Sequence, residues 1–191
     1  MAVRLTLICH APTMAMRVAA FPGDEPLEKV EPVKAMAAAS ALRRADRCWV
    51  SPELRTRQTA ETLGFDAVID PALRECDHGR WQGRTFADIQ KTEGEAGLTA
   101  WMRDPGARPH GGETLLELME RAGAWLAART GAQGHEVAVL HASVIRVMVM
   151  HAIGAPAASF WRIDVRPLSR TVLSYNGQWR MQAMGSMAPG E

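Results

Sequence analysis

The chain has 191 residues, of which 47% are hydrophobic and 23% charged. This balance is typical of a globular protein, because a disordered chain carries fewer apolar residues and more net charge. The net charge of +1 provides no overall field for nucleic acid or for an anionic membrane, so any anion site must be local. The three cysteines, at positions 9, 48 and 76, form no CxxC pair, which argues against a disulfide framework or a zinc cluster.

Strand and helix patterns alternate in the first half of the chain. An apolar strand is expected at residues 3–8, an alanine-rich helix at 31–42 and a second strand at 47–50. Ser51-Pro52 predicts an N-cap followed by proline at the first helical position, which would open a helix to about Leu63. A further helix is expected at 85–91.

The second half continues the alternation. Apolar residues at 115, 118, 119, 122, 125 and 126 share one helical face. A third strand is expected at 136–140, a helix at 143–153, and late strands at 161–165 and 171–175, with Asn176-Gly177 as a hairpin turn. Such alternation predicts an α/β protein, a three-layer α/β/α sandwich with a mainly parallel sheet. We expect a single domain over residues 1–191.

No membrane span is expected. The most apolar long stretch, residues 137–161, contains Arg146, and a central arginine costs about 2.5–3.5 kcal/mol on insertion into a bilayer. The apolar run before His10 is also too short for a signal-peptide core. We therefore expect a cytoplasmic protein.

Two expected strands end in a histidine followed by alanine, at His10-Ala11 and at His141-Ala142. Ligands of α/β sheets bind outside the carboxyl ends of the strands, so both histidines should lie at one edge. Arg55 and the helix start at Ser51-Pro52 are expected at the same edge, and together these groups outline a phosphate site. Each histidine alone could instead satisfy a strand-end hydrogen bond, and the repeated pattern favours the site.

Five segments in this order resemble the motifs of the histidine phosphatase superfamily, in its phosphoglycerate mutase-like branch 1. They are CHAPT at 9–13, SPELRTRQTA at 51–60, LRECDHGRWQG at 73–83, GGET at 111–114 and HASVIR at 141–146. The resemblance covers residues 5 to about 180 and implies a phosphoglycerate mutase-like fold. Since the chain is short compared with the mutases of the family, it is closer to the small broad-specificity or α-ribazole-phosphate type phosphatases.

The resemblance implies a phosphatase that acts on a small phosphomonoester without a metal or cofactor. His10 would be the nucleophile that forms a phosphohistidine. Arg55 and His141 would hold the phosphoryl oxygens. Glu75 would protonate the leaving alkoxide and then activate water.

Three further residues are expected to bind phosphate or substrate. Thr13 would hydrogen-bond near the nucleophile, and Ala142 follows His141 in the last motif. Arg17 is a candidate to supply a charge that the first motif lacks, as is Arg57, unless both are solvated helix residues. The implied partner is a small phosphorylated substrate, with no nucleic acid and no membrane, and the oligomeric state stays open.

Three positions depart from the family pattern. Cys9 stands where the family has arginine, Ala11 where it has glycine, and Met16 where it usually has asparagine. Losing one charge-assisted hydrogen bond, worth roughly 1.5–3 kcal/mol, would slow catalysis or weaken phosphate binding about 10- to 100-fold. A catalytically impaired pseudophosphatase that binds a phosphorylated ligand or partner is therefore the alternative, and a non-catalytic α/β interaction protein is a third hypothesis. A cysteine phosphatase is excluded. Its Cys-x5-Arg motif, if it began at Cys9, would require arginine at position 15, where this chain has alanine.

Overall fold

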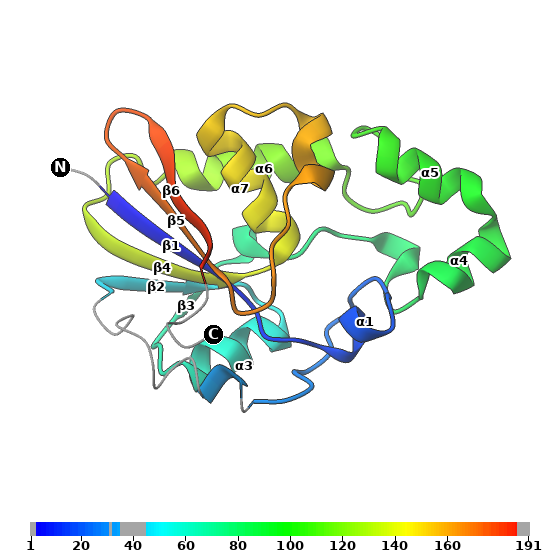
Figure 1. The fold of residues 1–191 in the computed structure, drawn as a ribbon, viewed down its shortest axis with the longest axis horizontal. Helices are drawn as coiled ribbons and strands as arrows, with labels where there is room; N and C mark the ends of the chain where they lie inside the picture. The colour runs from blue at the N-terminus through cyan, green and yellow to red at the C-terminus, as the bar shows by residue number, and fades with distance from the viewer. Residues whose placement is uncertain (1–2, 31, 35–44, 187–191) are drawn as a thin grey trace.

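The computed structural model describes residues 3–30, 32–34 and 45–186, and these contain a six-stranded sheet in the order β3-β2-β4-β1-β5-β6 (Figure 1). The strands are β1 Val3–Cys9, β2 Arg47–Val50, β3 Val68–Ile69, β4 Gly134–Leu140, β5 Arg170–Tyr175 and β6 Trp179–Ser186. The first four run parallel, and β5 and β6 add an antiparallel edge. The mainly parallel sheet is thus confirmed.

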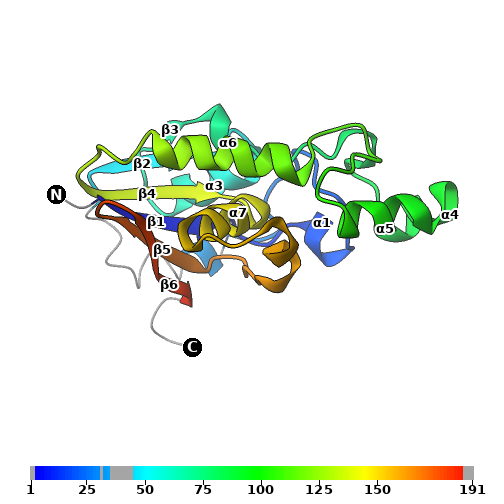
Figure 2. The ribbon, with the colours of Figure 1, turned by 90° about the horizontal axis from the view of Figure 1, so that it is seen from above.

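Helices cover both faces of this sheet. They are α1 Met14–Arg17, α3 Leu54–Thr62, α4 Phe86–Glu93, α5 Glu95–Arg103, α6 Leu115–Ala127 and α7 Ala142–Ile153, with short 3₁₀ turns η2 Pro71–Leu73, η3 Gly79–Trp81 and η4 Ala157–Arg162. Figures 1 and 2 show α6 and α7 on one face and α3 on the other, which confirms the three-layer sandwich. Helices α4 and α5 extend beyond the sheet as an arm, residues 86–103.

The central strands are buried on both faces. Leu5, Leu7 and Cys9 of β1 pack in the core under α6 and α7, whereas Ile8 points to the opposite core beside α3. This division follows from the two-residue period of a strand. A strand buried on both faces is apolar along most of its length, and this pattern identified β1 in the sequence.

One predicted helix start and one predicted strand are wrong. Helix α3 begins at Leu54 rather than at Ser51-Pro52, because the Ser51 hydroxyl bonds to side chains at the end of the sheet and caps nothing. Residues 161–165 are not a strand. The first two lie in the 3₁₀ turn η4, where Phe160 and Trp161 pack against helical residues rather than along a sheet.

Two other elements extend or limit the sequence prediction. Helix α5 was not predicted, and it begins after Gly94, whose φ of +78° suits glycine. The β5–β6 hairpin is confirmed, with a three-residue loop centred on Gly177. Most of the helix expected at 31–42 lies outside the described residues.

Candidate active site

His10 and His141 lie side by side at the carboxyl edge of the sheet. They directly follow β1 and β4, which are parallel neighbours. The backbone N–H of His10 donates to the carbonyl of Leu140 at 3.0 Å, and the two imidazole centroids are 5.3 Å apart. This geometry confirms the adjacency that the paired strand-His-Ala pattern predicted.

The His10 ring is oriented by its own backbone. Its Nδ1 lies 2.7 Å from the carbonyl oxygen of Ala11, which can only accept, so Nδ1 donates and Nε2 keeps its lone pair. Burial, followed by the positive charges of His141 and Arg55, lowers the pKa of His10 to about 3. The ring is therefore a neutral base at pH 7, with the unprotonated nitrogen that a nucleophile requires.

His141 is held by two residues of the segment that follows β2. Its Nε2 lies 2.8 Å from the hydroxyl of Ser51 and 3.0 Å from Oε2 of Glu53, and Ser51 also donates to Glu53. Burial would raise the pKa of Glu53, but the hydrogen bond and charge of His141 outweigh it and lower that pKa. The other ring nitrogen, Nδ1, lies 3.5 Å from Oε2 of Glu75 and has no hydrogen-bond partner among the described residues.

Arg55 occupies the first turn of α3, as predicted, and its side chain is fully buried. One terminal nitrogen donates to the carbonyl of Gly23 at 2.6 Å, and the other lies 3.7 Å from Glu75. Within the described part of the chain, its Nε and Nη2 form no hydrogen bond, and neither does the buried Oγ1 of Thr13. Buried donors are normally satisfied, so this group of unused donors indicates a site for an anion.

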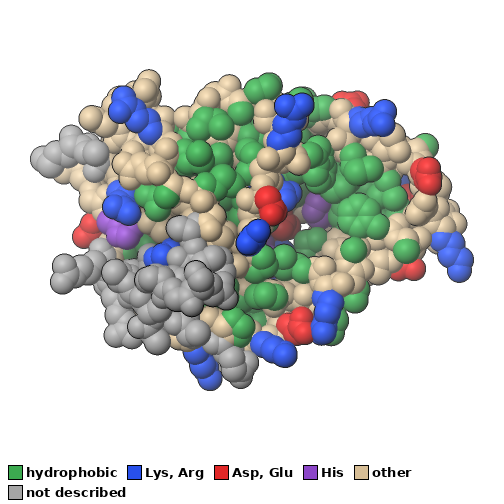
Figure 3. Space-filling view, viewed as in Figure 1, with side chains coloured by type: hydrophobic (Ala, Val, Ile, Leu, Met, Phe, Trp, Pro, Cys, Tyr) green, Lys and Arg blue, Asp and Glu red, His purple; other side chains and the backbone are tan. Residues whose placement is uncertain are grey.

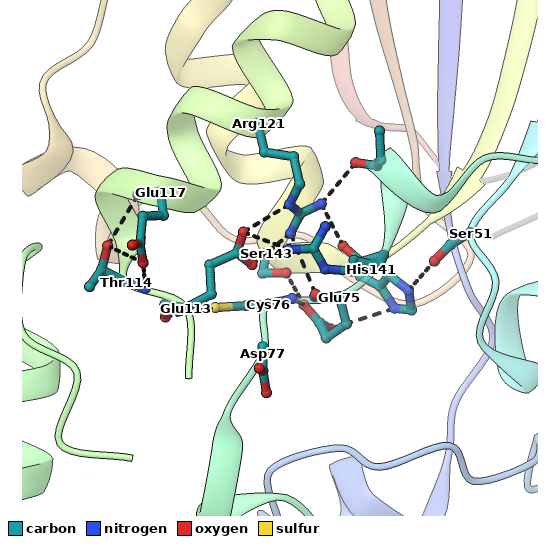
Figure 4. A network of polar contacts seen from close by, with 12 residues as sticks. Ser51, Glu75, Cys76, Asp77, Glu113, Thr114, Glu117, Arg121, His141 and Ser143 are labelled. Carbon is teal, nitrogen blue, oxygen red and sulfur yellow. Dashed lines mark hydrogen bonds and ion pairs between the residues drawn. The ribbon is translucent and has the colours of Figure 1, made fainter. Parts of the chain in front are cut away.

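Glu75 faces the same crevice from the loop after η2. Its Oε1 accepts hydrogen bonds from Ser143 of α7 and from the N–H of Cys76, and Figure 4 shows it directed toward His141. Burial alone would raise the pKa of Glu75, but the charges of His141 and Arg55 outweigh it and lower the pKa to about 2. An anion bound to those two cations would weaken their effect and raise the pKa of Glu75 again.

Arg121 of α6 positions the loop that carries Glu75 (Figure 4). Its guanidinium forms a two-pronged ion pair with Glu113, with N–O distances of 2.8 and 2.7 Å. It also donates to the carbonyls of Ala72 and Arg74 at 2.8 and 3.0 Å. The fixed fork of an arginine can hold several acceptors at once, so this side chain fastens the loop to α6.

The other predicted binding residues divide into two groups. Thr13 and Ala142 line the cavity beside His10. Arg17 does not, because α1 directs it to solvent, where it pairs with Glu28, and Arg57 is exposed as well. The geometry therefore gives neither arginine a contact with the proposed anion.

Arg146 is a cavity residue that the sequence analysis did not select, although it closes the last motif. It lies one turn beyond Ser143 on α7 and lines the same cavity as His10. Its buried Nε has no hydrogen-bond partner within the described residues, and its one ion pair, at 3.9 Å, is with the exposed Asp164. Its charge also acts on Cys9, whose thiol pKa rises to about 12 through burial and the charge of Glu75, with Arg146 opposing.

The fold and this crevice agree with a known family. A family model for the histidine phosphatase superfamily (branch 1) matches residues 5–186. The chain belongs to this superfamily. The recognition made from the five sequence motifs is thereby confirmed.

Curated relatives of this superfamily member include several phosphatases. A glucosyl-3-phosphoglycerate phosphatase of Mycobacterium tuberculosis is 29% identical over 175 residues, which cover 87% of this chain and 78% of that protein. Phosphoserine phosphatase 1 of Hydrogenobacter thermophilus is 25% identical over 182 residues, covering 90% and 86%. A bifunctional protein of M. tuberculosis is 28% identical over 131 residues, and this match covers 65% of the chain but 36% of that longer relative. The match thus spans about a third of the length of this bifunctional protein, as it does for two further mycobacterial relatives.

Solved structures support the same fold. A mycobacterial glucosyl-3-phosphoglycerate phosphatase in complex with VO₃ has a TM-score of 0.82 and 27% identity, with 96% of this chain and 98% of that chain covered. The α-ribazole phosphatase of Shigella flexneri has a TM-score of 0.85 at 22% identity, with 98% of each chain covered, and shows the fold alone. In the described part of this chain, no helix is long and apolar enough to cross a membrane, and no group of three or more His, Cys, Asp or Glu side chains is arranged to hold a metal ion.

Proposed function

We propose that this superfamily member is a phosphoric monoester hydrolase that cleaves a small phosphomonoester through a phosphohistidine on His10. The observation that carries this proposal is the convergence of unused buried donors around a neutral imidazole. Arg55, His141 and Thr13 each carry a buried donor that has no hydrogen-bond partner among the described residues. Thr13 lines the cavity beside His10, the His141 ring lies 5.3 Å from the His10 ring, and Arg55 lies 3.7 Å from Glu75. A phosphoryl group would satisfy these donors at once, which water could do only with less charge complementarity.

In the first step, Nε2 of His10 attacks phosphorus as the bond to the leaving oxygen breaks. Arg55 and His141 stabilise the charge on the equatorial oxygens. Glu75, protonated once the phosphoryl group has weakened the pull of the two cations, gives its proton to the leaving alkoxide. The products are the free alcohol and the phosphohistidine.

In the second step, Glu75 acts as a carboxylate. It accepts a proton from water as the water oxygen attacks phosphorus and the bond between phosphorus and Nε2 breaks. This returns His10 to its neutral form and releases inorganic phosphate. The hydrogen bond from Nδ1 to Ala11 keeps the ring proton on Nδ1, so Nε2 has a lone pair for the attack and takes it back when its bond to phosphorus breaks.

Cys9 supplies no charge to this site. We assign to Arg146 the role of the arginine that the family has at position 9. A buried thiol whose pKa is raised to about 12 stays neutral, whereas the guanidinium of Arg146 remains charged and lines the cavity. Among the described residues Arg146 has one ion pair, at 3.9 Å to the exposed Asp164, which leaves its donors available to an anion. This assignment favours an active phosphatase over the impaired pseudophosphatase.

The test is an aryl phosphate hydrolysis assay across pH with wild type and His10→Ala. We expect turnover by the wild type only. The Glu75→Gln variant, which releases its phosphoryl group slowly, should also gain the mass of one phosphoryl group after an alkaline quench. Wild type that binds phosphate but shows no turnover and no phosphoenzyme would support the pseudophosphatase instead.

A further inference from the structure

The cavity beside His10 changes character as it opens to solvent. Its volume is about 230 Å³, and its inner end carries His10, Thr13 and Glu75. The fully buried His141 and Arg55 lie next to His10 and Glu75 respectively. Its outer end, which we call the aromatic mouth, consists of Met16, Phe86, Trp101 and Trp161. In Figure 3 hydrophobic side chains gather over η4 and the arm, beside a hollow near the centre of this face.

The aromatic mouth is built from segments far apart in the sequence. Trp101 of the arm meets Trp161 of η4 edge to face, with centroids 4.8 Å apart. Phe86 stacks on Phe21 at 4.7 Å, and Phe21 lies beneath the mouth with an exposed fraction of 3%. Rings that lock one another in this way form a stable apolar wall at small entropic cost.

This wall leaves apolar surface uncovered. Trp161 is 45% exposed, Met16 44% and Phe86 36%, although all three line the cavity. Exposed apolar surface that borders a functional pocket is typical of a ligand-binding groove. An unbranched methionine can also adapt its shape to a ligand.

The cavity offers few partners to a hydroxylated ligand. Among the described residues that line it there is no Asn, Gln, Asp, Lys or Tyr. Outside the catalytic groups and Thr13, the polar side chains of the lining are those of Glu25, His78, Arg146, Ser143 and Cys76, together with the indole N–H groups of Trp101 and Trp161. Glu25 faces Arg55, and Ser143 and Cys76 already bond to Glu75 and to the carbonyl of Glu113. A sugar or hydroxy-acid leaving group would bring several hydroxyls to an aromatic surface, and each unpaired hydroxyl costs free energy.

We infer that the substrate is a phosphomonoester whose leaving group is an apolar alkyl or aryl alcohol bound by the aromatic mouth. This inference rests on the proposed phosphatase function. The phosphoryl group occupies the inner end between Arg55, His10 and His141. The carbon body of the leaving group covers the exposed faces of Met16 and Trp161.

A series of n-alkyl phosphates from ethyl to hexyl tests this inference, because the acidity of the leaving alcohol hardly changes along it. We expect kcat/KM to rise about fourfold for each methylene that becomes buried, the equivalent of about 0.8 kcal/mol. Hexyl phosphate should therefore be favoured over ethyl phosphate by about 10²-fold. Phosphoserine and 3-phosphoglycerate, which also release alkoxides, should be poorer substrates than hexyl phosphate.

Two variants of the aromatic mouth should weaken the dependence of kcat/KM on alkyl chain length. Trp161→Ala removes a wall, and Met16→Gln replaces an apolar surface by a polar one of similar size. Both should lower kcat/KM for hexyl phosphate at least about tenfold and leave ethyl phosphate within about twofold of wild type. The matched control is Leu116→Ala, which truncates a 51% exposed side chain outside the cavity and should change neither ester.

The outcomes separate this inference from the proposed function. If no ester is turned over by wild type, or if His10→Ala matches it, the phosphatase proposal fails. If wild type turns over the esters without any dependence on chain length, or prefers phosphoserine or 3-phosphoglycerate to hexyl phosphate, the apolar leaving group is wrong and the phosphatase stands. Flattening in Leu116→Ala as large as in Trp161→Ala would also overturn the inference.

Discussion

The two ends of the cavity beside His10 are stabilised by different forces. At the catalytic end, the side chains of Arg55 and His141 are fully buried, and hydrogen bonds or ion pairs fix their orientation. At the aromatic mouth, ring contacts hold side chains that remain partly exposed. A buried charged side chain must be paired with fixed hydrogen-bond or ion-pair partners. An apolar wall binds a ligand mainly through the fit of its surface. We therefore expect substitutions at the catalytic end to affect every ester, and those at the mouth to affect only esters with a large leaving group.

Among substitutions that leave the nucleophile His10 in place, Glu75→Gln should have the largest effect. The variant cannot protonate the leaving group, and general acid catalysis contributes about 10²–10⁴-fold. We expect a loss of that size for hexyl phosphate and a smaller loss for nitrophenyl phosphate, whose leaving group needs little help. Steady-state kinetics on the two esters measure the difference, and equal losses would exclude the acid role.

Arg146→Met should have the next largest effect. If Arg146 supplies the charge that Cys9 lacks, kcat/KM should fall about 10- to 100-fold for every ester, ethyl phosphate included. Inhibition by inorganic phosphate should weaken in parallel. Arg17→Met is the matched control, since Arg17 is exposed and outside the cavity, and it should leave both measurements within about twofold of wild type.

A Cys9→Arg substitution sharpens this prediction. In the Arg146→Met background, it should recover part of the lost activity, because a new guanidinium at that position would again carry charge toward the site. Thermal unfolding must accompany the kinetics, since Cys9 is fully buried and overpacking costs about 1–3 kcal/mol. No recovery in a folded double variant would show that the two positions do not share a role.

Glu53→Gln tests how His141 is held. Glu53 lies 3.0 Å from Nε2 of His141, and the opposite ring nitrogen, Nδ1, has no hydrogen-bond partner among the described residues. The amide of glutamine keeps the size of the side chain and removes its charge. Because a hydrogen bond to a charged group is worth roughly 1.5–3 kcal/mol, we expect kcat/KM to fall about tenfold for every ester. Glu61→Gln, at an exposed position on α3, should leave kcat/KM unchanged, and an unchanged kcat/KM in Glu53→Gln would disprove this positioning role.

The smallest expected effect is on stability. His10 has a pKa of about 3 in the folded protein against an ordinary value of 6.5, so the unfolded chain takes up the proton first as the pH falls. The stabilising contribution is therefore complete above about pH 6.5 and is lost as the pH falls toward 3. Between pH 7 and pH 5.5, wild type should lose on the order of 1 kcal/mol more unfolding free energy than His10→Gln. Urea unfolding measures this, and the exposed His151→Gln variant should behave as wild type.

Short-range sequence patterns were sufficient for most of the fold. The mostly apolar stretches of β1 and β4 identified buried strands, and the histidines that follow them were correctly placed at one edge. The wrong start of α3 has a long-range cause. Ser51 has the composition of an N-cap, but its hydroxyl is engaged by His141, 90 residues away in sequence. Local propensity loses to such a contact because the buried hydroxyl must have a partner.

The sequence by itself determined the family, the layered sheet and the four residues proposed for catalysis, because each depends on a short motif or on the period of a strand. Only the tertiary structure showed that Arg121 holds the loop of Glu75, that Arg146 reaches the cavity while Arg17 does not, and that Trp101 meets Trp161. These relations join segments separated by tens of residues. Whether these contacts form depends on how the helices pack on the sheet, and a local sequence pattern does not determine which distant segments come together.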